Sequence, residues 1–325
     1  MFNRLKWTFV VGGGLGLLAQ VVFWIVTAVF TDPSTLLGEL HASDTLVIMG
    51  IIGAVLGGLG IYRLFDARSH FGAGLPFSGF AFGIGEKMIH GWIEGKDKKH
   101  DSFLLCVWRG LWMVIWFNVL VFVATFIVAG ICYYGIGIHE ASQTLIPVTG
   151  FTIEGFPLIF TSFIFGGLIT CFFEFLLIKT KIGFVWILAF AWVFGAILTP
   201  IGIMPWLSAL GGWGTNVMIM NGGQILYNVA FMFFNGQAIA GFEFLVLVGT
   251  IGCLFLTGWL CFMVHIFQFG HKNQDGSPKI ALADGVTASP DGSSVGTAAV
   301  ARTAPPAKTM NIALFPPQQV PHQQE

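Results

Sequence analysis

Charged residues are scarce in this chain of 325 residues: only 10% are Asp, Glu, Lys or Arg, whereas 55% are hydrophobic. Soluble domains carry about 25% charged residues. A composition so poor in charge, with 34 Phe, 11 Trp and 43 Gly, excludes a soluble globular fold and predicts an integral membrane protein. The net charge of −1 points to no particular partner, and we expect no nucleic acid.

The sequence also lacks the patterns that hold disulfides, metals and cofactors. Its cysteines lie in or beside apolar runs, and an odd set inside hydrocarbon is not a disulfide framework. These cysteines are Cys106, Cys132, Cys171, Cys253 and Cys261. No Cys-x-x-Cys or His/Cys ligand spacing occurs, so we expect neither a metal nor a cofactor.

The residue sets of an intramembrane enzyme are missing as well. There is no His-Glu-x-x-His, no serine in a Gly-x-Ser-x-Gly setting, and no aspartate inside a predicted span. We therefore expect that the chain is not an enzyme.

Long apolar runs are abundant. The first, Phe9–Phe30, has about 22 residues, which is too long for a signal-peptide core and long enough to cross a bilayer. We predict six spans: 9–30, 45–62, 103–131, 157–178, 183–204 and 239–268. After residue 270 the composition changes to Ala, Pro, Gly, Ser and Gln, which predicts a disordered tail.

Basic residues set the predicted orientation. With six spans and a cytoplasmic N-terminus, all 15 Lys and Arg residues fall on the cytoplasmic side, as the positive-inside rule requires. Both ends are then cytoplasmic. Residues 211–236 leave an alternative open, because they are apolar enough to cross; Lys272 and Lys279 would then lie outside.

The two halves of the chain contain similar motifs in the same order. The matched pairs are Gly12-Gly13…Gln20 with Gly166-Gly167…Glu174, 53–61 with 195–203, and 72–74 with 212–214. Each unit holds three spans, an odd number, so two fused copies would be inverted relative to each other. The alternative is that these glycines serve close helix packing alone.

The predicted fold is an all-α integral membrane protein. Its six transmembrane helices form two inverted three-helix repeats, each with a glycine-rich broken or re-entrant hairpin. The predicted units are membrane repeat 1 (1–135), an outer loop (136–156), membrane repeat 2 (157–269) and a disordered cytoplasmic tail (270–325).

Three motifs carry a family resemblance. They are Gly12-Gly13…Gln20, Ala54-Val-Leu-Gly-Gly-Leu-Gly-Ile-Tyr62, and Phe71-Gly-Ala-Gly74 with Pro76-Phe-Ser-Gly-Phe80. They resemble the SpoVAC and SpoVAEb membrane proteins of the stage V sporulation protein A family. The resemblance covers residues 9–130 well and 160–265 loosely. The second copy departs from the pattern at Glu174, Thr199-Pro200 and Met218, and family members are single units.

The resemblance implies transport. Members of the family are associated with moving dipicolinic acid, with calcium, across the spore inner membrane. We therefore expect a channel or transporter subunit for a small anionic solute, with membrane lipid, other sporulation membrane proteins or further copies of itself as partners. The alternative is a non-conducting structural or assembly subunit.

Two groups of candidate site residues follow. The candidates for lining or gating a pathway are Gln20, Glu174, Gly72, Gly74, Pro76, Gly79, Gly212, Gly214, Asn221, Gln224 and Asn118. The candidates for attracting an anion to the cytoplasmic mouth are Arg63, Arg68 and Lys87.

Two of these candidates have alternative interpretations. Glu174 is an ionisable residue inside a span, which marks a functional candidate by default. It could instead be a protonated or snorkelling carboxyl that faces Lys179 or Lys181. Similarly, Lys87 could pair with its neighbour Glu86 at the surface.

Overall fold

The computed structural model describes residues 2–31, 40–94, 102–140, 144–145, 153–180 and 182–269. The predicted tail, about half of the predicted outer loop and Lys181 lie outside the described residues.

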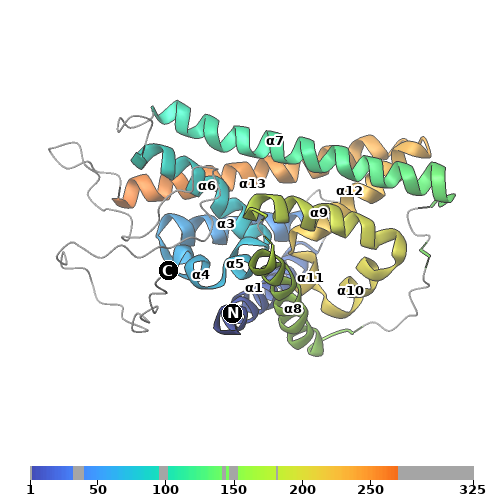
Figure 1. Ribbon diagram of the computed structural model, residues 1–325, viewed down its shortest axis with the longest axis horizontal. Coiled ribbons are helices and arrows are strands. Elements are labelled where there is room, and N and C mark those ends of the chain that lie inside the picture. Colours follow the sequence, from blue (N-terminus) through green and yellow to red (C-terminus); the bar gives the residue numbers. More distant parts are fainter. Residues whose placement is uncertain are drawn as a thin grey trace.

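The described residues form an all-helical structure without strands (Figure 1). Six helices are long and apolar enough to cross a membrane, which confirms the predicted number of spans. They are α1 (Phe2–Val29), α3 (His41–Gly58), α7 (Phe103–Gly130) with its continuation η2 (Ile131–Ile136), α8 (Pro157–Lys179), α9 (Phe184–Ile201) and α13 (Ala240–Phe269).

Several boundaries differ from the prediction. Helix α1 begins at Phe2, so it includes the basic residues that were expected to precede the first span. Helix α3 ends at Gly58 because Gly60 adopts a φ of 80°, a conformation that favours glycine and breaks the helix. After α7 the chain continues as a π-helix through Ile136, where a loop was expected.

Further helices connect the spans. Helices α4 (Ile61–Ser69), α5 (Phe71–Gly74) and α6 (Phe77–Glu94) have 9, 4 and 18 residues. Later in the chain, α10 (Ile203–Gly211), α11 (Trp213–Asn216) and α12 (Ile219–Phe234) have 9, 4 and 16. The order and lengths of α3–α7 thus resemble those of α9–α13. In this register 72–74 corresponds to 214–216, so the predicted match of 72–74 with 212–214 was wrong by two residues.

Where long helices cross, glycines allow their backbones to approach closely. Helices α1 and α8 are one such pair. A Cβ on Gly13 would lie 2.6 Å from the carbonyl oxygen of Phe163, and one on Gly167 would lie 2.8 Å from that of Phe9. Real Cβ atoms do not approach backbone oxygens so closely, so only glycine allows this crossing. Helix α13 approaches α3 similarly, since a Cβ on Gly58 would lie 2.7 Å from the Cys261 carbonyl oxygen.

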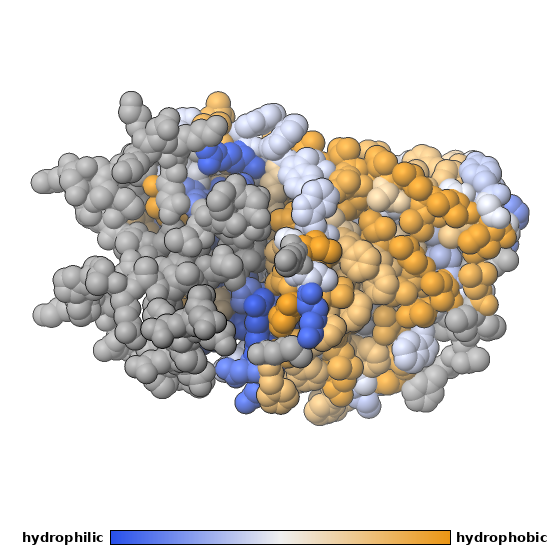
Figure 2. All heavy atoms as spheres, in the orientation of Figure 1, coloured by the Kyte–Doolittle hydropathy of each residue, from blue (hydrophilic) through white to orange (hydrophobic). Residues whose placement is uncertain are grey.

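Helices α7 and α13 lie along the long axis of the molecule and run in opposite directions (Figure 1). The outer face of α7 exposes large apolar side chains, among them Leu104, Val119 and Val123. Much of the surface in Figure 2 is likewise hydrophobic. A soluble protein rarely exposes so much apolar area, whereas lipid accommodates it.

Candidate functional site

The interior contains a short bridge between two broken segments. Pro76, between α5 and α6, pairs in an antiparallel manner with Met218, between α11 and α12. The Phe77 N–H donates to the Val217 oxygen at 2.9 Å, and the Ile219 N–H donates to the Leu75 oxygen at 3.1 Å. In this pattern residue 76 donates no hydrogen bond, so the missing N–H of proline costs nothing.

The bridge is closed. The side chains of Leu75, Val217 and Ile219 are fully buried, and Phe77 is 4% exposed. The interior at this level is therefore apolar and packed.

On one side of the bridge Glu174 organises a charged cluster. Its fully buried carboxylate forms an ion pair with Arg4 and accepts a hydrogen bond from the Phe71 N–H at 3.0 Å, at the start of α5. His70 Nδ1 lies 3.9 Å from the same carboxylate. Arg4 is thus the cation that the structure pairs with Glu174, whereas Lys179 lies over the ring of Phe175, and the alternative partner Lys181 lies outside the described residues.

Gln20 occupies the corresponding place on the other side. Its Oε1 accepts a hydrogen bond from the Trp213 N–H at 3.0 Å, at the start of α11, and lies 3.1 Å from Ser162 Oγ. Ser162 also bonds the Gly211 oxygen at 3.0 Å, just as Thr8 Oγ1 donates to the Ser69 oxygen at 2.8 Å. Both short helices are thus capped by a polar side chain from a distant span.

Arg63 and Arg68 among the predicted anion-attracting residues make contacts inside the protein. Arg63 donates to Glu86 Oε2 through Nε and Nη2, at 3.0 and 2.9 Å, and so neutralises Glu86. Arg68 lies over the Trp7 ring. The positive charge of Arg63 is therefore largely neutralised by Glu86 inside the protein.

The predicted glycines occupy tightly packed positions. A Cβ on Gly72 would lie 2.7 Å from the Thr8 oxygen, and Cβ atoms on Gly79 and Gly214 would clash with the carbonyl oxygens of Ala73 and Ser162. A Cβ on Gly74 would overlap the Phe184 ring, and Gly212 has a φ of 48°. These glycines let the broken segments pack against the spans, and in this conformation they line no open path.

The predicted polar residues of the helices are separated from one another. Asn118 Nδ2 donates to the Val114 oxygen of its own helix at 2.8 Å. Asn221 Nδ2 donates to the Asn216 oxygen at 3.0 Å, which ties α12 to α11. The Gln224 Oε1 is buried without a hydrogen-bond partner.

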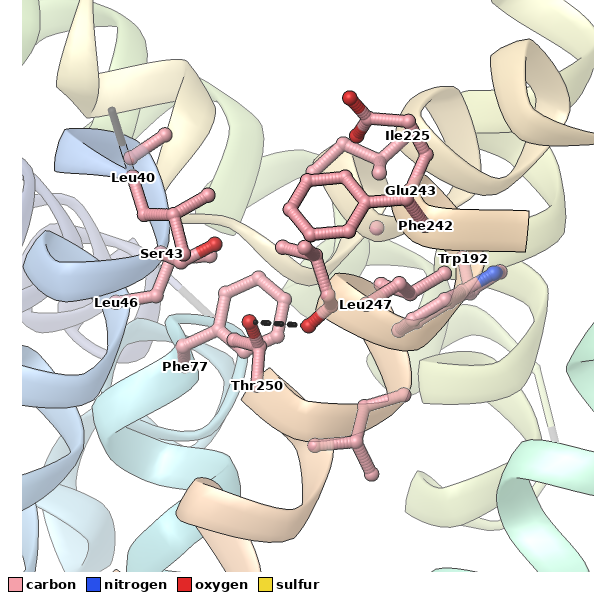
Figure 3. A pocket seen from close by; sticks show the side chains of 14 residues that line it. Leu40, Ser43, Leu46, Phe77, Trp192, Ile225, Phe242, Glu243, Leu247 and Thr250 are labelled. Atoms are coloured by element: carbon pink, nitrogen blue, oxygen red, sulfur yellow. Dashed lines mark hydrogen bonds between the residues drawn. The ribbon is translucent and has the colours of Figure 1, made fainter. Parts of the chain in front are cut away.

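A cavity of about 280 Å³ reaches the bridge from one side (Figure 3). It lies between the beginnings of α3 and α13, with Phe77 of the bridge, Trp192 and Ile225 among its walls. Its polar lining includes Ser43, Glu243 and Thr250, and Thr250 donates to the Val246 oxygen at 2.9 Å. None of the predicted pathway residues lines this cavity.

Sequence reasoning identified Gln20, Glu174 and Pro76 but missed what they contact. Arg4 precedes the predicted first span, and the caps on α5 and α11 involve backbone N–H groups that no motif reveals. Among the described residues, no group of three or more His, Cys, Asp or Glu side chains is placed to hold a metal.

Comparison with known proteins gives one match. Residues 4–100 match the model of the SpoVAC/SpoVAEB sporulation membrane protein family, and this segment contains α1 to α6 with all three quoted motifs. No match was found among curated proteins or among solved structures. The looser resemblance of residues 160–265 thus rests on the sequence alone. Residues 4–100, less than a third of the chain, are thus similar to the SpoVAC/SpoVAEB sporulation membrane protein family.

Proposed function

We propose that this sporulation membrane protein is a channel or transporter subunit for a small anionic solute, which passes between the two halves of the chain. The observation that carries the proposal is the bridge, where a broken segment from each half meets the other at Pro76 and Met218. Transporters built from repeats place their substrate sites at such broken helices. The family resemblance implies dipicolinic acid with calcium as the solute and the spore inner membrane as the location.

We infer further that the halves are inverted repeats with glycine-rich re-entrant segments. Three observations support this: the matched lengths of the helices in the two halves, the matched caps at Glu174 and Gln20, and the opposite directions of α7 and α13. Two equivalent segments that enter from opposite sides would meet at a pseudo-two-fold axis. A pairing of equivalent residues, Pro76 with Met218, is what such an axis produces.

The bridge is then the gate. The cavity reaches the bridge at Phe77 from one side. Passage requires α5–α6 and α11–α12 to separate. Only two backbone hydrogen bonds join them at the bridge, and each contributes about 0.5–1.5 kcal/mol net.

A solute-flux assay, in which a disulfide can hold the two sides of the bridge together, tests this proposal. Residues 76 and 218 form a non-hydrogen-bonded pair, whose Cα atoms lie about 4.5 Å apart, within the range of a disulfide. In a variant with the five native cysteines replaced, we expect Pro76→Cys with Met218→Cys to block dipicolinate efflux from loaded liposomes when oxidised. Reduction should restore efflux.

Chloride-loaded and calcium-loaded liposomes control for solute identity, and each single-cysteine variant controls for the substitutions. No dipicolinate efflux from the wild-type protein under any voltage or tension would reject transport by this chain alone. Efflux that persists in the crosslinked protein would reject the bridge as the gate.

The second candidate function is a non-conducting assembly subunit that binds other sporulation membrane proteins or further copies of itself. The observation that favours it is the apolar, fully packed bridge together with the tightly packed glycines. Absence of flux, with retention of the folded protein in the membrane, would support this function.

We propose that both termini lie in the cytoplasm. Gln237, in the exposed turn between α12 and α13, would then face outward, and Lys179, exposed at the end of α8, would face the cytoplasm. We expect a membrane-impermeant thiol reagent added outside cells to label Gln237→Cys and to leave Lys179→Cys unlabelled until the membrane is opened. The reverse pattern would overturn the orientation, and labelling of both would overturn the six-span topology.

A further inference from the structure

The charged side of the bridge contains a third carboxyl that the proposed function does not use. Asp66 lies on α4, on the buried face that also carries Tyr62 and Ser69. Only 8% of Asp66 is exposed, and its Oδ1 is buried without a hydrogen-bond partner.

Two of the positive charges near Asp66 are committed to other carboxylates. Arg63 neutralises Glu86, and Arg4 neutralises Glu174. The charged or titratable groups on α4 and around it are Arg4 and Lys6 of α1, Tyr62, Arg63 and Arg68 of α4, His70, Glu86 and Lys87 of α6, Glu174 of α8 and His265 of α13. Arg4 and Arg63 each face another carboxylate, and no hydrogen bond reaches the buried Oδ1 of Asp66.

The other half of the chain has an uncharged version of this cluster. The matched position of Asp66 is Ser208, that of Glu86 is Asn228, and that of Glu174 is Gln20. The same arrangement of helices therefore forms without a carboxyl at the place of Asp66. What Asp66 adds to its half is the capacity to take up and release a proton.

Burial makes the proton-bound form the stable one. An unpaired carboxylate is costly to bury, and such a group normally stays neutral. Burial raises the pKa of Asp66 well above its ordinary value of 3.8, and the negative charges of Glu86 and Glu174 raise this pKa further.

We propose that Asp66 is a proton-binding site, which holds a proton while α4 is packed against the protein and releases it to water when α4 moves away. Helix α4 leads directly into α5 and the bridge, so its displacement would disturb the gate. Because the group is the carboxyl of this chain, the inference does not depend on whether the chain conducts a solute.

The sign of the pH effect follows from the raised pKa. The packed arrangement binds the proton more tightly than the open one does. Its stability is greatest below the ordinary pKa of 3.8 and falls as the pH rises from there towards the raised pKa.

Two measurements on the full-length protein in lipid test the proposal. Infrared spectroscopy at about pH 7 should detect the carbonyl band of a protonated carboxylic acid that Asp66→Asn removes. Thermal unfolding followed by tryptophan fluorescence should show that Asp66→Asn is more stable than the wild type at about pH 9, with a difference that shrinks by about pH 5.

Asp66→Ser is the second variant, in case the amide of asparagine disturbs folding. It introduces the residue of the matched position and should give the same two results. Glu243→Gln, at the edge of the cavity, is the control and should leave both measurements as in the wild type. An infrared band that persists in both Asp66 variants, or a pH dependence of stability that neither changes, would overturn the proposal.

Discussion

Replacement of Glu174 by Leu is expected to lower the free energy of unfolding by about 3 kcal/mol. The change removes the ion pair with Arg4 and leaves the Phe71 N–H buried without an acceptor. Breaking a buried pair costs about 3–5 kcal/mol when the remaining charge stays buried. Arg4 is 36% exposed and can turn towards water, so we expect the lower end of that range.

Glu174→Gln is the matched variant, because glutamine performs the equivalent capping role at Gln20. It keeps an acceptor for the Phe71 N–H and should cost much less, so the protein stays folded. If Glu174 also takes part in gating, this variant changes the dipicolinate flux. Chemical unfolding in detergent micelles measures the first effect, and the liposome assay measures the second.

Equal stability of the leucine, glutamine and wild-type proteins would contradict the structural role of Glu174. An unchanged flux in a folded Glu174→Gln protein would restrict Glu174 to that structural role.

Gly13→Ala is expected to destabilise the protein by about 3 kcal/mol, at the upper end of the usual cost of overpacking. Its Cβ would lie 2.6 Å from the Phe163 carbonyl oxygen, a backbone atom that cannot move aside without separating α1 from α8. The next residue supplies the control, since a Cβ on Gly14 meets nothing within 4 Å. Gly14→Ala should be neutral or stabilise α1 by up to about 1 kcal/mol through helix propensity.

Unfolding of both variants under identical conditions measures the difference. Gly167→Ala, whose Cβ would lie 2.8 Å from the Phe9 oxygen, should behave like Gly13→Ala. If Gly13→Ala and Gly14→Ala are equally stable, the close crossing of α1 and α8 is incorrect.

The spans could be predicted from the sequence because hydropathy acts along a continuous stretch of chain. The break at Gly60 was less visible, since Ile61 and Tyr62 continue the apolar run of α3 beyond it. Matching motifs also paired Gln20 with Glu174, although they gave no indication that each caps a four-residue helix.

Contacts between distant segments could not be predicted. Arg4 and Glu174 lie 170 residues apart, and no local pattern joins them. The same holds for the cavity, whose walls come from α3, α6, α9, α12 and α13. A sequence motif indicates the local structure of one helix, whereas the ion pair and the cavity depend on how several helices pack together.

The separation between Arg4 and Glu174 has a consequence for how the protein is made. Ribosomes add about 5–20 residues per second, so α1 waits roughly ten to thirty seconds before its partner in α8 is synthesised. During that interval the guanidinium of Arg4 needs water or lipid phosphate. The ion pair that neutralises the buried carboxylate of Glu174 therefore forms only after the fourth span has been translated.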